Sequence, residues 1–154
     1  MTLFYYKTTI GRIGIAEHNG KISNLFFETD PVPPGYRLLE TAALKAAAWQ
    51  LHAYLEGSLQ VFSLPLEPAG TDFMRRVWQA LGEIPFGETV SYKQLALAVG
   101  SPQASRAVGQ ASNRNPIPIF IPCHRVIGAD GKLVGYRGGI DLKRKLLELE
   151  GVQF

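Results

Sequence analysis

The chain of 154 residues contains a single cysteine, Cys123. One thiol cannot form an intramolecular disulfide framework, which argues against an oxidising compartment. Residues 1–14 lack the charged start, apolar run and small-residue cleavage site of a signal peptide. No apolar run approaches the length of a membrane span. We therefore expect no membrane partner, and a cytoplasmic location, or a nuclear one if the source is eukaryotic.

Metal-ligating residues are scarce as well. There is no second cysteine to accompany Cys123, and the chain has only three histidines. His18 and His52 lie far from His124 in the sequence and show no ligand spacing. We therefore expect no metal site and no cofactor.

Positive charge is scarce in the first half of the chain and concentrated in the second. Residues 1–70 carry 5 Lys or Arg against 6 Asp or Glu, whereas residues 71–154 carry 11 against 7. A basic excess in one half indicates an anionic partner there, with nucleic acid the first candidate. A random imbalance of surface charge explains the same counts equally well.

The first part of the chain predicts a small α/β unit. Three short segments rich in aromatic and β-branched residues read as strands, and Asn19-Gly20 is a strong hairpin signal between the last two. Residues 38–57 show apolar positions at helical spacing, with Gly57 at the end. LEPAGT, residues 66–71, resembles a linker.

Helix signals dominate the second part. Thr71 can cap a helix through residues 72–84. Ser91 and Gln94 form a capping box for the next helix, and Gly100 suits the position just past its end.

The following helix is predicted from Ser101 as N-cap and Pro102 as first helical residue. It must stop by Asn115, because the residue before Pro116 is disfavoured in the α region. Two short helices joined by a tight turn are typical of a helix-turn-helix. Many such pairs do not touch DNA, but together with the charge distribution the pattern favours DNA.

The segment NPIPIFIPCHRVIG, residues 115–128, contains three prolines and is otherwise mostly apolar, so it predicts an extended, buried chain. A glycine-rich loop, KLVGYRGG, follows. Asp141 is then predicted to cap a last helix that ends at Gly151, with Leu142, Leu146 and Leu149 on its inner face.

The thiol and the imidazole of Cys123 and His124 are adjacent in this buried segment. A thiol is nucleophilic only as thiolate, and an apolar pocket opposes that charge unless a base or a cation assists. Neighbours on an extended chain point opposite ways, so direct contact is not assured and a bridging water is the alternative. Glu150 is the carboxylate we nominate to orient His124, on the side of the helix away from a solvent-facing cluster of Lys143, Arg144 and Lys145.

Three interpretations of this pair remain open from local chemistry. A small core cysteine beside a satisfied buried histidine is the commonest case for an arbitrary pair. A nucleophile with its base is the second. A cysteine protease would use the same pair, but it does not explain the helix-turn-helix or the basic half.

The segments around the thiol follow a known order. IPCHRVI is preceded by RAVGQASNRNPIP and followed by GYRGG and LKRKLLELEG. The sequence thereby resembles the O6-alkylguanine-DNA alkyltransferases (methylated-DNA–protein-cysteine methyltransferases), closely over residues 71–151 and in layout only before that.

This resemblance implies two domains. Residues 1–68 would form an N-terminal α/β domain of ribonuclease-H-like fold. Residues 69–154 would form a mainly α winged helix-turn-helix domain that approaches the minor groove of double-stranded DNA. A monomer would flip an O6-alkylated guanine, mainly O6-methylguanine, out of the duplex and take its alkyl group irreversibly, once per molecule.

The resemblance also implies roles for the residues at the thiol. Cys123 would be the alkyl acceptor and His124 its base, acting through a water. Glu150 would orient His124. Asn115 would tie the helix-turn-helix to the active-site segment.

Two further groups of residues carry over in the same way. Arg106 would enter the base stack, Tyr92 would contact the flipped base and its phosphate, and the remaining helix residues would allow close approach to DNA: Ser105, Ala107 and Gly109. The base pocket would be lined by Pro118, Tyr136 and the backbone of Val126 and Arg137. Arg137 stands where relatives often have a small residue, which bears on the pocket's size.

Two other classes of protein remain as alternatives. A non-enzymatic binder of damaged DNA shares this fold, but such proteins lack the reactive cysteine that this chain has. A thiol hydrolase with no affinity for DNA is the other.

Overall fold

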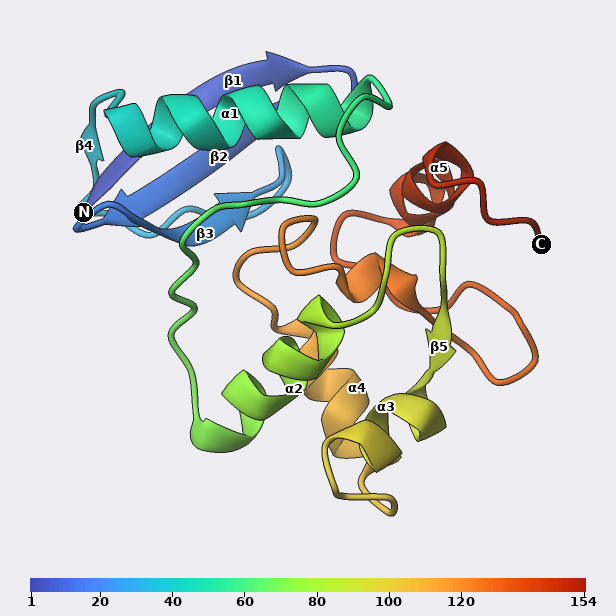
Figure 1. Ribbon diagram of the computed structural model, residues 1–154. Helices are drawn as coiled ribbons and strands as arrows, with labels where there is room; N and C mark the ends of the chain where they lie inside the picture. Colours follow the sequence, from blue (N-terminus) through green and yellow to red (C-terminus); the bar gives the residue numbers. More distant parts are fainter. The chain divides into compact units, whose positions relative to one another are not determined.

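The N-terminal strands form one mixed sheet. The structure is a computed structural model that describes residues 1–154, in two units, Met1–Ala69 and Gly70–Phe154. In the first unit the sheet order is β3-β2-β1-β4, with β1 (Thr2–Thr8), β2 (Gly11–His18), β3 (Lys21–Phe26) and β4 (Arg37–Leu38) (Figure 1). Neighbours pair antiparallel except β1 with β4.

The turn between β2 and β3 follows the predicted hairpin signal. Asn19 and Gly20 both have positive φ, 52° and 81°. Two successive positive φ values define the type I′ turn, whose twist matches that of paired strands. The hairpin prediction is therefore confirmed.

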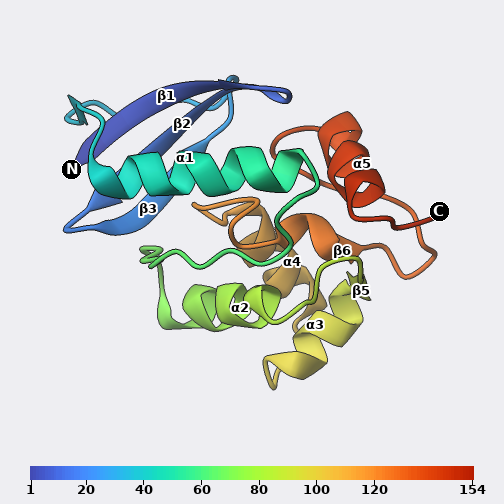
Figure 2. The same cartoon turned by 45° about the horizontal axis from the view of Figure 1, so that its top comes forward.

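Helix α1 (Ala42–Leu55) lies along one face of this sheet (Figure 2). It begins four residues later than predicted, because the hydroxyl of Thr41 caps it by accepting from the Leu44 N–H. Leu38, predicted as the first helical residue, belongs to β4 instead. The other face of the sheet carries a small apolar cluster of Leu3, Ala16 and Phe26, with Val32 and Tyr36 from the following loop packed on it.

Three helices make the centre of the second unit. They are α2 (Asp72–Gly82), α3 (Tyr92–Ala98) and α4 (Ser105–Asn113). Thr71 caps α2, and the Ser91–Gln94 capping box is present, as predicted. The indole N–H of Trp78 on α2 donates to the Ala111 carbonyl on α4 at 2.8 Å. This bond fixes α4 against α2 from inside the unit.

The start of α4 differs from the prediction. The helix begins at Ser105, and neither Ser101 nor Pro102 belongs to it. Ser101 is engaged by the preceding helix, because its N–H bonds the Ala96 carbonyl while the Gly100 N–H bonds Leu97. These two bonds close α3 in the Schellman manner, with Gly100 at φ 77°. Residues 101–104 form a turn, in which the Ala104 N–H donates to the Ser101 carbonyl at 2.9 Å.

A two-stranded parallel sheet links α3 to the thiol segment. β5 (Val90–Ser91) pairs with β6 (Val126–Ile127), which directly follows the 3-10 helix η1 (Cys123–Arg125). Since α3 begins at Tyr92, this pairing brings the first residue of α3 near Cys123.

Helix α5 (Ile140–Leu149) corrects two predictions. Its N-cap is Gly139, with φ 97°, and Asp141 lies in the first turn and makes no cap. Lys143 is fully buried, so the predicted solvent-facing basic cluster is reduced to Arg144 and Lys145. Leu146 and Leu147 are buried, whereas Leu142 and Leu149 are only partly so.

No helix combines the length and the hydrophobicity needed to cross a bilayer.

Candidate active site

Asn115 organises the segment that leads to the thiol. Its side-chain amide donates to the Ile121 carbonyl at 2.8 Å, and its side-chain oxygen accepts from the Ile117 N–H at 2.9 Å. Between these bonds Ile119 has a φ of 74°, which is strained for a β-branched residue. Both Asn115 and Ile119 are buried. Asn115 therefore holds a strained buried loop at both ends.

The thiol stands on a turn, and the prediction of an extended chain through it was wrong. The Cys123 N–H bonds the Ile121 carbonyl at 2.8 Å around Pro122, whose φ of −81° and ψ of 66° define an inverse γ-turn. The 3-10 helix follows immediately. Proline excludes a long helix but permits a short one that begins after it. Cys123 and His124 consequently do not alternate across an extended strand.

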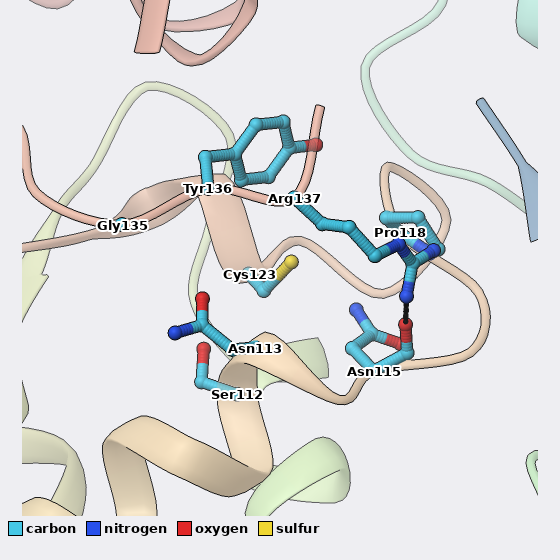
Figure 3. Close-up of a pocket in the computed structure, with 8 residues that line it drawn as sticks. All are labelled: Ser112, Asn113, Asn115, Pro118, Cys123, Gly135, Tyr136 and Arg137. Carbon is cyan, nitrogen blue, oxygen red and sulfur yellow. Dashed lines mark hydrogen bonds between the residues drawn. The ribbon is translucent and has the colours of Figure 1, made fainter. Parts of the chain in front are cut away.

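A small pocket lies at Cys123 (Figure 3). On one side are residues from the end of α4 and the segment after it, and on the other is the glycine-rich loop. The lining residues are Ser112, Asn113, Asn115, Pro118, Cys123, Gly135, Tyr136 and Arg137. Its volume of about 10 Å³ is that of a single water site. Val126 is fully buried and is not part of the lining.

The thiol is in an environment that disfavours its charged form. Cys123 is 8% exposed, and burial raises its pKa. Three neighbours act in the opposite direction: the Asn115 side chain by hydrogen bonding, and the cations of Arg137 and Lys143 by their charge. Burial dominates, so the thiolate is a minority form at neutral pH until something assists its formation.

His124 and Glu150 meet as predicted from their spacing. The Nε2 of His124 lies 2.7 Å from a carboxylate oxygen of Glu150, and both side chains are fully buried. Burial lowers the pKa of His124, partly offset by Glu150. A neutral imidazole is the form that can accept a proton.

Arg125 completes this buried group and was not singled out from the sequence. Its Nε and Nη2 donate to the two carboxylate oxygens of Glu150 at 2.9 and 3.0 Å, and its Nη1 donates to the Ile84 carbonyl. The Gly87 N–H also donates to Glu150 at 3.0 Å. Two other chain segments thereby hold the carboxylate, and the signal that could have indicated this is the arginine inside the motif itself.

Lys143 is a second residue that sequence reasoning missed. Its ammonium donates to the Val134 carbonyl at 2.8 Å from inside the unit. Burial lowers its pKa to about 8, and the nearby Cys123 acts against that shift. The cation therefore both anchors the glycine-rich loop and favours the thiolate.

The residues predicted to meet DNA lie on α3 and α4. Arg106 and Ala107 are exposed, whereas Ser105 and Gly109 are half-buried. A side chain at Gly109 would contact the ring of Tyr92 at 3.5 Å, so this glycine faces α3. Tyr92 is partly buried, and its pKa is raised by burial and by the charge of Cys123. Tyr92 thus connects the helix pair to the thiol.

Comparison with known proteins identifies the family. Residues 72–152 match the family described as 6-O-methylguanine DNA methyltransferase, DNA binding domain. Residues 1–68 match the family described as 6-O-methylguanine DNA methyltransferase, ribonuclease-like domain. The chain belongs to the 6-O-methylguanine DNA methyltransferase family. The expected two-part architecture, a ribonuclease-like domain followed by a DNA-binding domain, is confirmed.

Three curated relatives are methylated-DNA–protein-cysteine methyltransferases. The methylated-DNA–protein-cysteine methyltransferase of Mycobacterium bovis is 46% identical over 153 residues, covering 96% of this chain and 93% of the relative. The constitutive enzyme of that name from Bacillus subtilis is 44% identical over 155 residues, covering 96% and 94%. The enzyme of that name from Methanosarcina barkeri is 60% identical over 106 residues, covering 69% and 67%.

Solved structures agree with this family. The crystal structure of Mycobacterium tuberculosis OGT in complex with DNA is similar with a TM-score of 0.92 and 45% identity, over 97% of this chain and 92% of that one. The O6-methylguanine-DNA methyltransferase of Pyrococcus kodakaraensis is similar with a TM-score of 0.63 and 26% identity, over 98% and 100%.

Proposed function

We propose that this protein repairs alkylated DNA by direct reversal, moving the alkyl group of O6-methylguanine onto Cys123. The observation that carries the proposal is the placement of the only thiol in a pocket, next to a buried His124–Glu150 pair. Relatives of this chain are methylated-DNA–protein-cysteine methyltransferases, and a similar structure is a complex with DNA.

The chemistry is a displacement at the alkyl carbon. The Cys123 proton passes to neutral His124 through a bridging water, which leaves a thiolate. The sulfur forms a bond to the alkyl carbon while the carbon–O6 bond breaks, and the electron pair goes to the guanine. A proton returned from the imidazolium through the water neutralises the base. The product is unmodified guanine and S-alkylcysteine.

This reaction uses the protein once. The thioether is stable, because a thiolate is a poor leaving group when a neighbouring side chain attacks the alkyl carbon. The chain also has no second thiol to take the alkyl group. Cys123 is therefore consumed, and one molecule repairs one lesion.

The base must leave the helix to react. The O6 atom of a stacked guanine is out of reach of a buried thiol, so the nucleotide is extruded at a cost of a few kcal/mol. In the proposal α3 and α4 act as a winged helix-turn-helix that approaches the minor groove. Exposed Arg106 enters the stack, Ala107 and Ser105 permit close approach, and Tyr92 contacts the flipped base. The protein acts as a monomer in the cytoplasm, or in the nucleus of a eukaryote.

The pocket must widen to admit a base. Its volume of about 10 Å³ holds a water, whereas ligand sites in proteins are typically some 300 Å³ or more. Gly135, with φ 50°, lies in the wall of the pocket, and Gly139, with φ 97°, closes the same loop. Glycines give that wall the backbone freedom to move.

Intact mass spectrometry tests the proposal. The protein is incubated with one equivalent of duplex containing a single O6-methylguanine, with the same duplex carrying guanine as control. One methyl mass on the Cys123 peptide is the expected result, and none for Cys123→Ser. Methyl transfer by Cys123→Ser would place the nucleophile elsewhere, and tight lesion binding without a mass change would select the non-enzymatic binder.

A further inference from the structure

The guanidinium of Arg137 ties the two walls of the thiol pocket together. Its Nη1 donates to the main-chain carbonyl of Asn115 at 2.8 Å, which the dashed line in Figure 3 marks. Asn115 belongs to the wall that follows α4, and Arg137 belongs to the glycine-rich loop opposite. The bond therefore runs from wall to wall beside the thiol.

The sulfur of Cys123 points toward the Arg137 side of the pocket. Figure 3 shows Sγ directed at the Tyr136–Arg137 backbone and away from Ser112. The charge of Arg137 acts on the thiol, which also places the guanidinium in this neighbourhood. An alkyl group that is attacked by Sγ must occupy space on the side from which Sγ approaches it. Arg137 borders that space.

Two of the hydrogen bonds that hold the loop carrying Arg137 differ in the exposure of their donors. Behind the loop, Lys143 donates to the Val134 carbonyl from a fully buried position on α5. At the rim, Arg137 is exposed to solvent. The exposed guanidinium of Arg137 can exchange this bond for bonds to water, whereas the buried ammonium of Lys143 would lose its partner without replacement. The hydrogen bond from Arg137 to the Asn115 carbonyl is therefore the one that we expect to break when the pocket opens.

We propose that Arg137 is a specificity-determining residue that limits the size of the alkyl group this protein accepts. The inference rests on the proposed alkyl transfer to Cys123 and deepens it. A methyl group fits after a small displacement of the rim. A longer chain requires the Arg137 side chain to leave the Asn115 carbonyl and its position beside Sγ.

A competition between two lesions isolates this effect. Duplexes of one sequence carry either O6-methylguanine or O6-butylguanine, and the second-order rate constant of transfer is measured for each by intact mass. The ratio of butyl to methyl rate is compared between the wild type and Arg137→Ala. Loss of the Arg137 charge slows both lesions alike, because it acts on the thiol, so it cancels in the ratio.

The ratio should rise at least threefold in Arg137→Ala, the order of change expected from releasing one hydrogen bond. Arg137→Lys, which keeps the charge with a shorter reach, should give an intermediate ratio. Arg144→Ala removes an exposed arginine of α5 and should leave the ratio unchanged. Unfolding midpoints of all variants are measured to confirm that the fold is intact.

Two failures are distinguishable. A butyl-to-methyl ratio in Arg137→Ala within twofold of the wild type, with methyl transfer still occurring, overturns the role of Arg137. Absence of methyl transfer in the wild type itself overturns the proposed function instead.

Discussion

The guanidinium of Arg125 donates to both carboxylate oxygens of Glu150, at 2.9 and 3.0 Å, and both side chains are buried. Glu150 is therefore shared between a permanent cation and His124. The arginine takes up much of the carboxylate's charge, and its own charge adds to burial in lowering the pKa of His124. A histidine beside a carboxylate of this kind stays neutral at physiological pH and is ready to take a proton.

Replacing Arg125 should cost more stability than replacing any surface arginine. Arg125→Met leaves the Glu150 carboxylate buried with one cation fewer, and breaking one side of a buried pair typically costs about 3–5 kcal/mol. Urea unfolding at pH 7.5 measures the free energy. Arg144→Met, at an exposed position of α5, is the matched control and should change it by less than about 0.5 kcal/mol. Equal stability of the two variants would contradict the buried role of Arg125.

The rate of methyl transfer should rise with pH from neutral into the alkaline range, because burial raises the pKa of Cys123. Lys143→Met removes a cation that lowers this pKa, so the thiolate fraction and the rate at pH 7.5 should both fall. Single-turnover rates across pH measure both effects. The wild-type profile should be shallower than a single titration, since Lys143, with a pKa of about 8, loses its charge in the same range.

Lys145→Met provides the matched control for that experiment, since Lys145 is exposed on the same helix. Its profile should coincide with that of the wild type. A Lys143→Met profile that also coincides would show that Lys143 does not act on the thiol.

Stability should fall as the pH drops below about 6.5, the ordinary pKa of a histidine. The folded pKa of His124 is lowered, so in this window the unfolded chain binds a proton that the native protein does not. By linkage the free energy of unfolding then decreases with decreasing pH. His124→Gln should reduce this slope between pH 7 and 5, measured by urea unfolding; an unchanged slope would contradict the lowered pKa of His124.

Gly70 is predicted to be intolerant of a side chain. A Cβ there would overlap the ring of Trp78, whose N–H bond to Ala111 fixes the ring in place. Gly70→Ala should therefore destabilise the protein by about 1–3 kcal/mol. Gly82→Ala, with open space at its Cβ, should be neutral or stabilising by up to about 1 kcal/mol. Thermal unfolding compares the two, and equal midpoints would refute the tight Gly70–Trp78 contact.

Arg106→Ala should slow repair of duplex DNA more than repair of the same lesion in a single strand. The proposed role of Arg106 is to fill the stack that the flipped base leaves, and a single strand has no such gap. The ratio of duplex to single-strand transfer rates measures this. Arg76→Ala, at an exposed position of α2, is the control. Equal slowing of both substrates would indicate a general phosphate contact instead.

Local signals predicted the elements that depend on local chemistry. Thr71, the Ser91–Gln94 box and the Asn19-Gly20 turn act within four residues of themselves, and each is present as expected. The prediction of where α4 begins was wrong because a neighbouring motif was overlooked. Ser101 carries a strong N-cap signature, but its carbonyl accepts from the Ala104 N–H in a turn that directly follows the closure of α3, and sequence reasoning did not consider that turn.

The site depended on contacts between distant segments. His124 and Glu150 could be paired from the motif and the helix spacing, but a third segment also holds the pair of Arg125 and Glu150. Its Ile84 carbonyl accepts from Arg125, and its Gly87 N–H donates to Glu150. Lys143 looked like a surface lysine because its helix carries two more basic residues beside it. Its burial follows from carbonyls of a loop nine residues away, a contact without any local signature.

The burial of the only thiol, that of Cys123, provides a way to measure how often the pocket opens. A small aromatic disulfide reagent is larger than the single-water pocket at that thiol, so labelling should require the pocket to widen, and no other thiol in the chain competes for the reagent. At high reagent concentration, the labelling rate should then equal the rate at which the pocket opens. The rate at which the pocket opens can thus be measured in the absence of DNA.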